Sequence, residues 1–295
     1  MSKLHNKIKW KNSINRFAYS EIDVQGECTM KTAIKAWINI VVFISLLVIN
    51  YFSSAGLING TNQKEMSDKY LTSITPASFT FSIWGIIYTL IFIALILMVL
   101  NRNKSSYRLI IDKFSPLFWL SSLFNIAWIV LFLYDKIFIS TIFIAALTIV
   151  LVVINQVIVE NNDNKKNMLA LSFGLYNGWV LIATIINMAA YLVKSGWNRF
   201  GLSQEIWGII LLSLSFIIVV RTMAKLRNAS FPLSAAWGCY GIYKLLVSST
   251  GLGSDYSLLP VISVSYMFLL IVVAVIQFKS NKWKLIPAPK ANIYL

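Results

Sequence analysis

Eight long apolar stretches dominate the sequence, and each is about as long as a helix that crosses a bilayer. A hydrocarbon core of about 30 Å and a rise of about 1.5 Å per residue require about 20 apolar residues in a row. The stretches therefore predict an all-α integral membrane helix bundle with about eight transmembrane helices. They cover residues 36–57, 76–100, 115–134, 138–159, 169–192, 203–222, 233–250 and 257–278.

The composition excludes a soluble domain. Apolar residues make up 58% of the chain and charged residues only 13%, whereas soluble domains average roughly half apolar and about a quarter charged. The linkers between the stretches are too short to hold a separate folded domain. The chain is therefore predicted to form one membrane domain.

The placement of the positive charges predicts the orientation of the chain. The net charge of +15 would on its own suit a nucleic-acid partner. Of the 26 Lys and Arg residues, however, twenty lie in the two tails and the linkers after the second, fourth and sixth stretches, and five lie in the other linkers. Positive residues collect on the cytoplasmic side, so we expect a multi-pass protein of the cell membrane with both termini in the cytoplasm. No nucleic-acid partner is expected, and the basic face should favour anionic membrane lipids.

The two ends of the chain are predicted to be cytoplasmic tails. Residues 1–35 are polar, mixed in charge and without a sustained period, which is typical of a mobile tail. Met30 offers a second start just before the first stretch, so residues 1–29 are either a native tail or an extension. Residues 279–295 form the second, shorter basic tail.

Three of the stretches carry aromatic and amide residues at helical spacing. In the fifth stretch such residues recur at i, i+3, i+7 and i+11, which places them on one face of a helix. The second and third stretches carry shorter stripes of the same kind. Their members are Tyr176, Trp179, Ala183 and Asn187 in the fifth stretch, Trp84 and Tyr88 in the second, and Asn125, Trp128 and Phe132 in the third.

These stripes are predicted to lie at one depth in the membrane. Counted from the expected outer ends of their helices, most of these residues lie roughly 8 to 14 Å below the outer surface. Rings and amides at one level suit a pocket for a flat apolar ligand with a few polar groups. The linker 58–75 is the longest external loop and is the natural lid. The alternative is structural, because Trp and Tyr crowd membrane interfaces and buried Asn often bonds a neighbouring helix.

The same positions match a family pattern. Pro76 stands eight residues before Trp84, and Tyr88 follows four residues after it. The third stretch contributes Phe124, Asn125, Trp128 and Phe132. The fifth contributes Leu175, Tyr176, Trp179, Ala183, Thr184 and Asn187. At these offsets the chain resembles the translocator protein family, also called tryptophan-rich sensory proteins (TspO/MBR). It departs from the pattern at Thr75 and Leu175, where the family has Pro, and it lacks the Trp that precedes the family's Pro pair.

The resemblance covers residues 36–192 and implies a five-helix bundle there. Residues 193–278 would then add three transmembrane helices with no counterpart in the short family members. The resemblance also implies a pocket between the second, third and fifth helices, closed by the first external loop, for a porphyrin or another tetrapyrrole, or for a sterol-like molecule. Its implied lining is Pro76, Trp84, Asn125, Trp128, Phe132, Trp179 and Ala183, followed by Tyr88, Tyr176 and Asn187.

The chain lacks the usual residues of catalysis. His5 in the tail is its one histidine, and Glu160 and Glu205 lie at the ends of stretches, so the membrane part lacks the usual acid and base groups. We therefore expect a ligand-binding protein rather than an enzyme, although family members have been linked to porphyrin breakdown. No metal site and no required cofactor are expected, with a porphyrin as a ligand only.

Two further alternatives remain open from the sequence. A secondary transporter is the second hypothesis, although the two halves show no internal repeat. Lys244 inside the seventh stretch either extends to the outer interface or pairs with an acidic group on a ligand. Both a monomer and a homodimer are compatible with the sequence.

Overall fold

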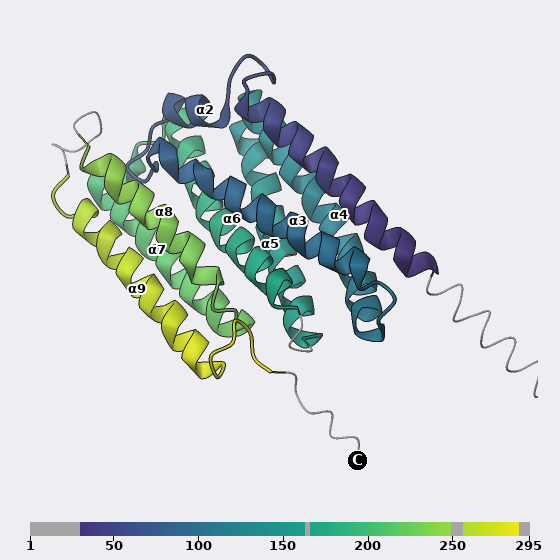
Figure 1. The fold of residues 1–295 in the computed structure, drawn as a ribbon. Coiled ribbons are helices and arrows are strands. Elements are labelled where there is room, and N and C mark those ends of the chain that lie inside the picture. The colour runs from purple at the N-terminus through teal and green to yellow at the C-terminus, as the bar shows by residue number, and fades with distance from the viewer. Residues whose placement is uncertain (1–29, 163–165, 249–255, 289–295) are drawn as a thin grey trace, which may run out of the picture.

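The structure, a computed structural model, describes residues 30–162, 166–248 and 256–288. The described residues form a bundle of long helices (Figure 1) and contain no β-strand. The long helices are Met30–Ser54, α3 (Ile83–Leu100), α4 (Ser105–Leu133), α5 (Ile137–Glu160), α6 (Asn167–Lys194), α7 (Gln204–Leu226), α8 (Phe231–Leu246) and α9 (Leu259–Ser280). Three short elements lie in the loops, namely α2 (Gln63–Lys69), η1 (Ser78–Ser82) and η2 (Arg199–Gly201). The predicted all-α bundle is confirmed.

Seven helices in the described part of the chain are long and apolar enough to cross a membrane. The exception among the eight predicted spans is α8, which has 16 residues and reaches only about 24 Å at 1.5 Å per residue. Its predicted stretch, 233–250, is helical to Leu246. The helix packs between α6 and α9, so it is enclosed by longer helices.

The N-terminal helix is already formed at Met30, so residues 30–35 of the predicted tail are helical. Polar contacts with α4 explain this extension beyond the apolar stretch. Lys35 Nζ lies 2.7 Å from Asp112 Oδ1, and Thr32 Oγ1 donates to Asp112 Oδ2 at 3.0 Å. Residues 1–29, which are most of the predicted N-terminal tail, and residues 289–295, which are the last part of the predicted C-terminal tail, lie outside the described residues.

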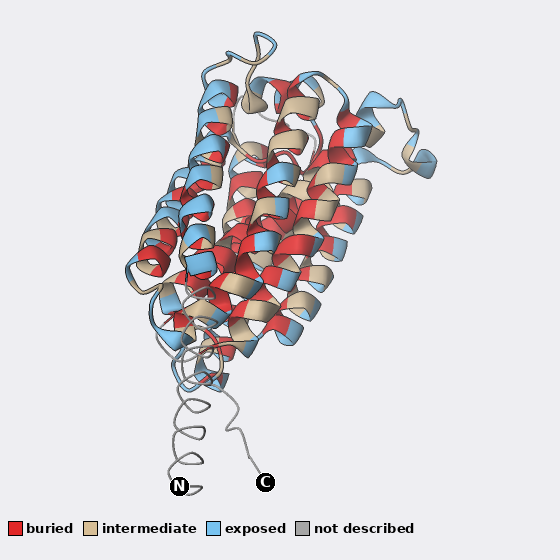
Figure 2. Ribbon diagram, turned by 90° about the vertical axis from the view of Figure 1, so that its right-hand side faces the viewer, coloured by how far each residue is buried: buried red, intermediate tan, exposed pale blue. Residues whose placement is uncertain are grey.

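Helix α6 is the centre of the bundle. It packs against α3, α5, α7 and α8, and Tyr176 and Trp179 are among the largest fully buried side chains. Two hydrophobic cores meet along this helix. The first joins α6 to the N-terminal helix, α3, α4 and α5, and the second joins it to α7, α8 and α9. Figure 2 shows buried residues on the inward faces of the helices and exposed residues on the outward faces.

The outward faces carry large apolar side chains, as a protein surrounded by lipid requires. Ile86, Phe92, Leu123, Ile149 and Val272 are all exposed. In water an exposed apolar surface of this extent would drive association, whereas acyl chains are as apolar as these residues. The surface and the helix lengths together identify a multi-pass membrane protein.

Candidate ligand-binding site

The rings of the three predicted stripes meet around Trp84. This indole stacks on Tyr88, with ring centroids 5.2 Å apart and an interplanar angle of 20°. Its centroid lies 6.1 Å from that of Trp128, 5.9 Å from that of Tyr176 and 6.3 Å from that of Trp179. The aromatic residues of α3, α4 and α6 therefore form one cluster.

A small inner cavity of about 40 Å³ lies beside this cluster. At this volume it has room for a few water molecules. Seven of the ten predicted site residues line it, namely Pro76, Trp84, Trp128, Phe132, Trp179, Ala183 and Asn187. The rest of its lining is Gln63, Ser67, Phe81, Ile186 and Ala190.

A larger outer cavity of about 460 Å³ lies on the other side of Trp84, between the N-terminal helix, α2 and the start of α3. It is lined by Leu47, Asn50, Tyr51, Ser54, Asn62, Gln63, Lys64, Phe81, Trp84 and Tyr88. Three of these residues, Gln63, Phe81 and Trp84, also line the inner cavity. They form the wall between the two cavities.

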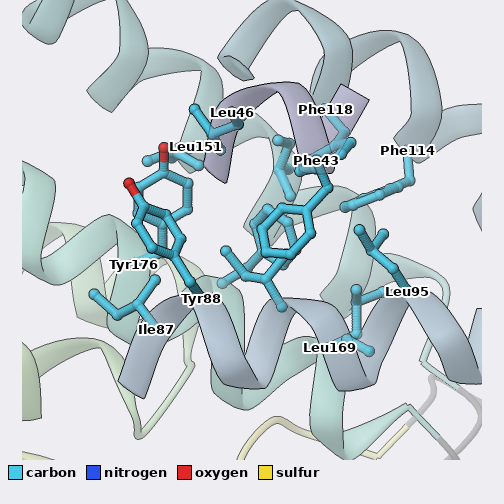
Figure 3. Packing of buried hydrophobic residues seen from close by; sticks show 14 of the residues in the cluster. Phe43, Leu46, Ile87, Tyr88, Leu95, Phe114, Phe118, Leu151, Leu169 and Tyr176 are labelled. Carbon is cyan, nitrogen blue, oxygen red and sulfur yellow. The ribbon is translucent and has the colours of Figure 1, made fainter. Parts of the chain in front are cut away.

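The remaining predicted residues, Asn125 and Tyr176, form part of a buried hydrogen-bonded chain. Tyr88 donates to Asn50 Oδ1 at 2.9 Å, and Asn50 Nδ2 donates to Asn125 Oδ1 at 3.3 Å. Asn125 Nδ2 in turn donates to the hydroxyl group of Tyr176 at 2.9 Å. Figure 3 shows the rings of Tyr88 and Tyr176 with their hydroxyl groups on the same side. Neither Asn125 nor Tyr176 lines the inner or the outer cavity. This hydrogen-bonded chain instead joins four helices behind the aromatic cluster, namely the N-terminal helix, α3, α4 and α6.

Asn187 also has protein partners, although it lines the inner cavity. Its Oδ1 accepts from Trp128 Nε1 at 3.1 Å, and its Nδ2 donates to Thr141 Oγ1 on α5 at 2.6 Å. These two bonds fix the side chains of Trp128 and Asn187 relative to each other. The structural and the ligand-lining alternatives for Asn187 are therefore compatible.

Trp179 differs from Trp128 because its indole N–H has no hydrogen-bond partner among the described residues. The side chain is only 2% exposed, and its Nε1 is buried without an acceptor. A buried donor without a partner costs about 1–3 kcal/mol. Trp179 also lines the inner cavity, so an unpaired donor and a cavity wall belong to the same side chain.

The lid predicted over residues 58–75 contains the helix α2. Asn62 caps it, since its Oδ1 accepts from the backbone N–H of Glu65 at 3.0 Å, while the Glu65 carboxylate accepts from the backbone N–H of Asn62 at 3.2 Å. This capping box is a sequence signal for a helix start. Gln63 and Ser67 of α2 both line the inner cavity, so the lid forms part of the site.

Ionic contacts fasten the lid to the turn between α4 and α5. Lys69 Nζ and the hydroxyl group of Tyr70 lie 2.9 Å and 3.0 Å from Asp135 Oδ2, and Lys194 Nζ lies 2.7 Å from Asp135 Oδ1. Burial alone would raise the pKa of Asp135, but the hydrogen bonds from Lys194, Lys69 and Tyr70 outweigh it and lower the pKa to about 2. Asp135 is therefore ionised at neutral pH.

The C-terminal helices support the other border of the site. The backbone N–H of Ala77 donates to the carbonyl oxygen of Gly241 on α8 at 3.0 Å. Trp237 Nε1 of the same helix donates to the carbonyl oxygen of Thr80 in η1 at 2.9 Å. Gly241 permits this approach, because a Cβ atom there would lie 2.1 Å from Thr80 Oγ1. Helix α8 thus holds η1, which carries the cavity-lining residue Phe81.

Asn50 of the first stretch, Gln63 of the lid and Phe81 of the second stretch were not among the predicted site residues. Asn50 lies inside an apolar stretch, which is itself a signal for an interhelical hydrogen bond. Phe81 and Gln63 carry no comparable signal. The inner cavity is lined by aromatic rings, side-chain amides, one hydroxyl group and aliphatic side chains. Lys64 is the charged residue in the lining of the outer cavity. In the described part of the chain, no cluster of His, Cys, Asp and Glu could hold a metal ion.

Comparison with known proteins gives one match. A family model described as TSPO-like protein matches residues 36–278. The matched region includes the three C-terminal helices that the sequence motifs leave out. No curated protein and no solved structure matches the chain.

Proposed function

Because the chain belongs to the family of TSPO-like proteins, we propose that it is a membrane protein that binds a flat apolar ligand between the N-terminal helix, α2, α3, α4 and α6. The observation that carries the proposal is the position of Trp84. Its indole separates the two cavities and is surrounded by four other aromatic rings. Aromatic faces around one space favour a planar ligand.

The cavity volumes support a ligand that enters by displacing the wall at Trp84. Ligand pockets usually measure about 300–1,000 Å³, a range that includes the outer cavity of about 460 Å³ but not the inner one of about 40 Å³. A molecule the size of a tetrapyrrole or a sterol would place its body in the outer cavity. Rotation of Trp84 and Phe81 would then join the two spaces and bring an edge of the ligand to Trp179.

The polar groups define what the ligand must carry. The unpartnered Trp179 N–H would donate to an acceptor such as a carboxylate, carbonyl or hydroxyl oxygen. Lys64 at the lid pairs with Asp68 in this structure, and it would bind an acidic substituent by exchanging that partner. A porphyrin offers both a flat ring system and carboxylates, and a sterol offers one hydroxyl group. We therefore propose a porphyrin or related tetrapyrrole ahead of a sterol-like ligand, with no cofactor required.

We propose that the protein acts by binding its ligand, in a sensory, regulatory or translocating role, and not as an enzyme. The groups that line the two cavities support this. They are aromatic, amide, hydroxyl and aliphatic apart from Lys64, which lies in the lid. Rings and amides hold a ligand, whereas general acid and base catalysis needs titratable groups near the reacting atoms.

The proposed orientation puts the cavities near the outer surface of the cell membrane. The ends at residues 30 and 288 lie at one end of the bundle and α2 at the other (Figure 1). The excess of Lys and Arg in the sequence belongs to the first of these ends, and positive residues favour the cytoplasmic side. The lid would then face outward.

The proposal is tested by fluorescence quenching of the purified full chain with protoporphyrin IX. Saturable quenching is expected, and Trp84→Phe and Trp179→Phe should each weaken the measured affinity. Trp283→Phe is the matched control, because Trp283 is 65% exposed and follows α9 at the opposite end. An unchanged affinity in both cavity variants would show that the ligand binds elsewhere. Uptake of the porphyrin into proteoliposomes would separate transport from binding.

A further inference from the structure

A third cavity, remote from the lid, lies at the end of the bundle where the described chain begins and ends. Its volume is about 830 Å³. It is bordered by the start of α4, the end of α5, the end of α7 and the C-terminal segment 281–288. The lining comprises Ser106, Leu109, Gln156, Val159, Glu160, Asn161, Asn162, Lys166, Lys225, Leu226, Arg227, Pro287 and Ala288.

The C-terminal segment builds one wall of this cavity. Asn281 Nδ2 donates to the carbonyl oxygen of Arg227 at 2.8 Å, and the backbone N–H of Ala229 donates to the carbonyl oxygen of Leu285 at 2.8 Å. Asn162 Nδ2 at the end of α5 donates to the carbonyl oxygen of Pro287 at 2.8 Å. The segment therefore bridges α5 and the turn between α7 and α8, so the cavity is part of the folded structure.

The charge of the lining is mainly positive. Lys166, Lys225 and Arg227 contribute cations, against the carboxylate of Glu160. Lys166 is buried, and its Nζ donates to the carbonyl oxygen of Asn161 at 2.8 Å. The side chains of Lys225 and Arg227 are exposed and make no ion pair or hydrogen bond with the described residues. Two cations are thus available to an anion in the cavity.

The rest of the lining is amphipathic. Leu109, Val159 and Leu226 provide an apolar part, while Gln156 and Asn161 provide amides. Leu109 is 51% exposed and lies in the first turns of α4, just before the apolar stretch of that helix. A ligand that combines a negative headgroup with an apolar chain fits this lining better than a small anion, which would leave the apolar part unused.

We propose that this cavity binds one anionic glycerophospholipid, with its phosphate between Lys225 and Arg227 and the upper part of an acyl chain against Leu109 and Leu226. The site is separate from the proposed ligand pocket, and its occupancy does not depend on that function. By tying a lipid to α4, α5, α7 and the C-terminal segment, it would join the two cores of the bundle at this end.

Native mass spectrometry of the detergent-purified full chain tests the proposal, with phosphatidylglycerol and phosphatidylcholine added in equal amounts. One phosphatidylglycerol should be retained in preference to phosphatidylcholine. The double variant Lys225→Gln/Arg227→Gln should lose roughly thirtyfold in apparent affinity, on the basis of about 1 kcal/mol for each basic residue. The matched control is Lys104→Gln/Lys279→Gln, which removes the same charge from exposed residues at the same end that do not line the cavity, and it should retain the lipid.

Two further measurements keep the outcome decisive. Ala288→Trp fills the cavity without changing its charge and should also release the lipid, which covers the case in which the double variant fails to fold. Inorganic phosphate at millimolar concentration should not displace the lipid. Three outcomes would each overturn the proposal. They are equal retention of phosphatidylglycerol and phosphatidylcholine, unchanged lipid affinity in both the double variant and Ala288→Trp, and displacement of the lipid by phosphate alone.

Discussion

The comparison of Trp128 with Trp179 gives the sharpest prediction. Both indoles line the inner cavity, and replacement by Phe removes the same atoms from each. Trp128 Nε1 donates to Asn187 Oδ1 at 3.1 Å, whereas Trp179 Nε1 has no partner in the part of the chain that the structure describes. Trp128→Phe therefore leaves the buried acceptor of Asn187 with one bond fewer, while Trp179→Phe removes a donor that is already unsatisfied.

The difference in unfolding free energy between the two variants isolates the contribution of the hydrogen bond, because the loss of ring contacts is similar in both. An unsatisfied buried group costs about 1–3 kcal/mol, and hydrogen bonds between membrane helices contribute about 0.6 kcal/mol on average and up to about 1.7 kcal/mol. The free energy of unfolding of Trp128→Phe should thus lie about 1–2 kcal/mol below that of Trp179→Phe. Denaturant titration of both variants in the same micelles measures it.

Ligand binding should rank the two variants in the opposite order. If the Trp179 N–H donates to the ligand, its removal costs about 0.5–1.5 kcal/mol of binding free energy, or roughly a twofold to tenfold weaker affinity. Trp128→Phe should lose less, because its N–H already bonds within the protein. The assignment of Trp179 as the free donor would be refuted if Trp128→Phe were both the less stable variant and the weaker binder of the two.

Four other predictions test separate parts of the structure. Asp135→Asn should release the lid and speed tryptic cleavage of the loop 58–75. In the wild type, the stabilisation of the lid by ionised Asp135 should be complete above the ordinary pKa of 3.8. It should be lost as the pH falls toward the folded pKa of about 2. Gly178→Ala should destabilise the bundle, because its Cβ would lie 2.0 Å from a carbonyl oxygen of α8. Gly85→Ala is the control, since nothing lies within 4 Å of its Cβ, and it should be neutral or slightly stabilising. Denaturant titration of both variants measures the difference. Trp237→Phe should weaken porphyrin quenching about threefold through loss of its bond to η1, although it lines neither cavity. Asn50→Leu should lower the free energy of unfolding by about 1–2 kcal/mol, because it leaves partners in α3 and α4 unpaired, and an unchanged value would contradict the role of this chain.

Much of the fold follows from the sequence because membrane helices are specified by length and apolarity. The predicted stretch 138–159 corresponds to α5 (Ile137–Glu160), and 169–192 corresponds to α6 (Asn167–Lys194). The largest error is at α4, which begins ten residues before the predicted start at 115. Those residues include Asp112, whose contacts with the N-terminal helix stabilise a turn of helix that hydropathy does not reveal.

The stripes of the site could be predicted because helical spacing fixes which side chains share a face. Spacing does not reveal which neighbour that face meets. Asn125 and Trp128 lie on one stripe of α4, yet Asn125 bonds Asn50 and Tyr176, whereas Trp128 lines the inner cavity. The wall residue Phe81 was unpredictable for the same reason, since η1 is positioned by α8, more than 150 residues away in the sequence.

Helix α6 connects the two halves of the bundle because it presents a different face to each. Tyr176, Trp179 and Ala183 face the aromatic cluster and the cavity. The alternate face carries Gly174 and Gly178, which approach the start of α8 so closely that a Cβ atom would lie 2.0 Å from Ser230 Oγ or from the carbonyl oxygen of Phe231. A bundle that ended at residue 192 would leave this face of α6 without the helix against which it packs.

The C-terminal helices are therefore part of the same unit as the site. They occupy the small-residue face of α6, and through α8 they hold η1 against the cavities. Asn177 shows that an unpartnered group alone does not mark a site. Both of its amide atoms are buried without a partner among the described residues, yet it lies in the sequence between Gly174 and Gly178, the two glycines that approach the start of α8. Trp179 combines an unpartnered donor with an adjoining cavity, and this combination makes its N–H the strongest candidate for ligand contact in the described part of the chain.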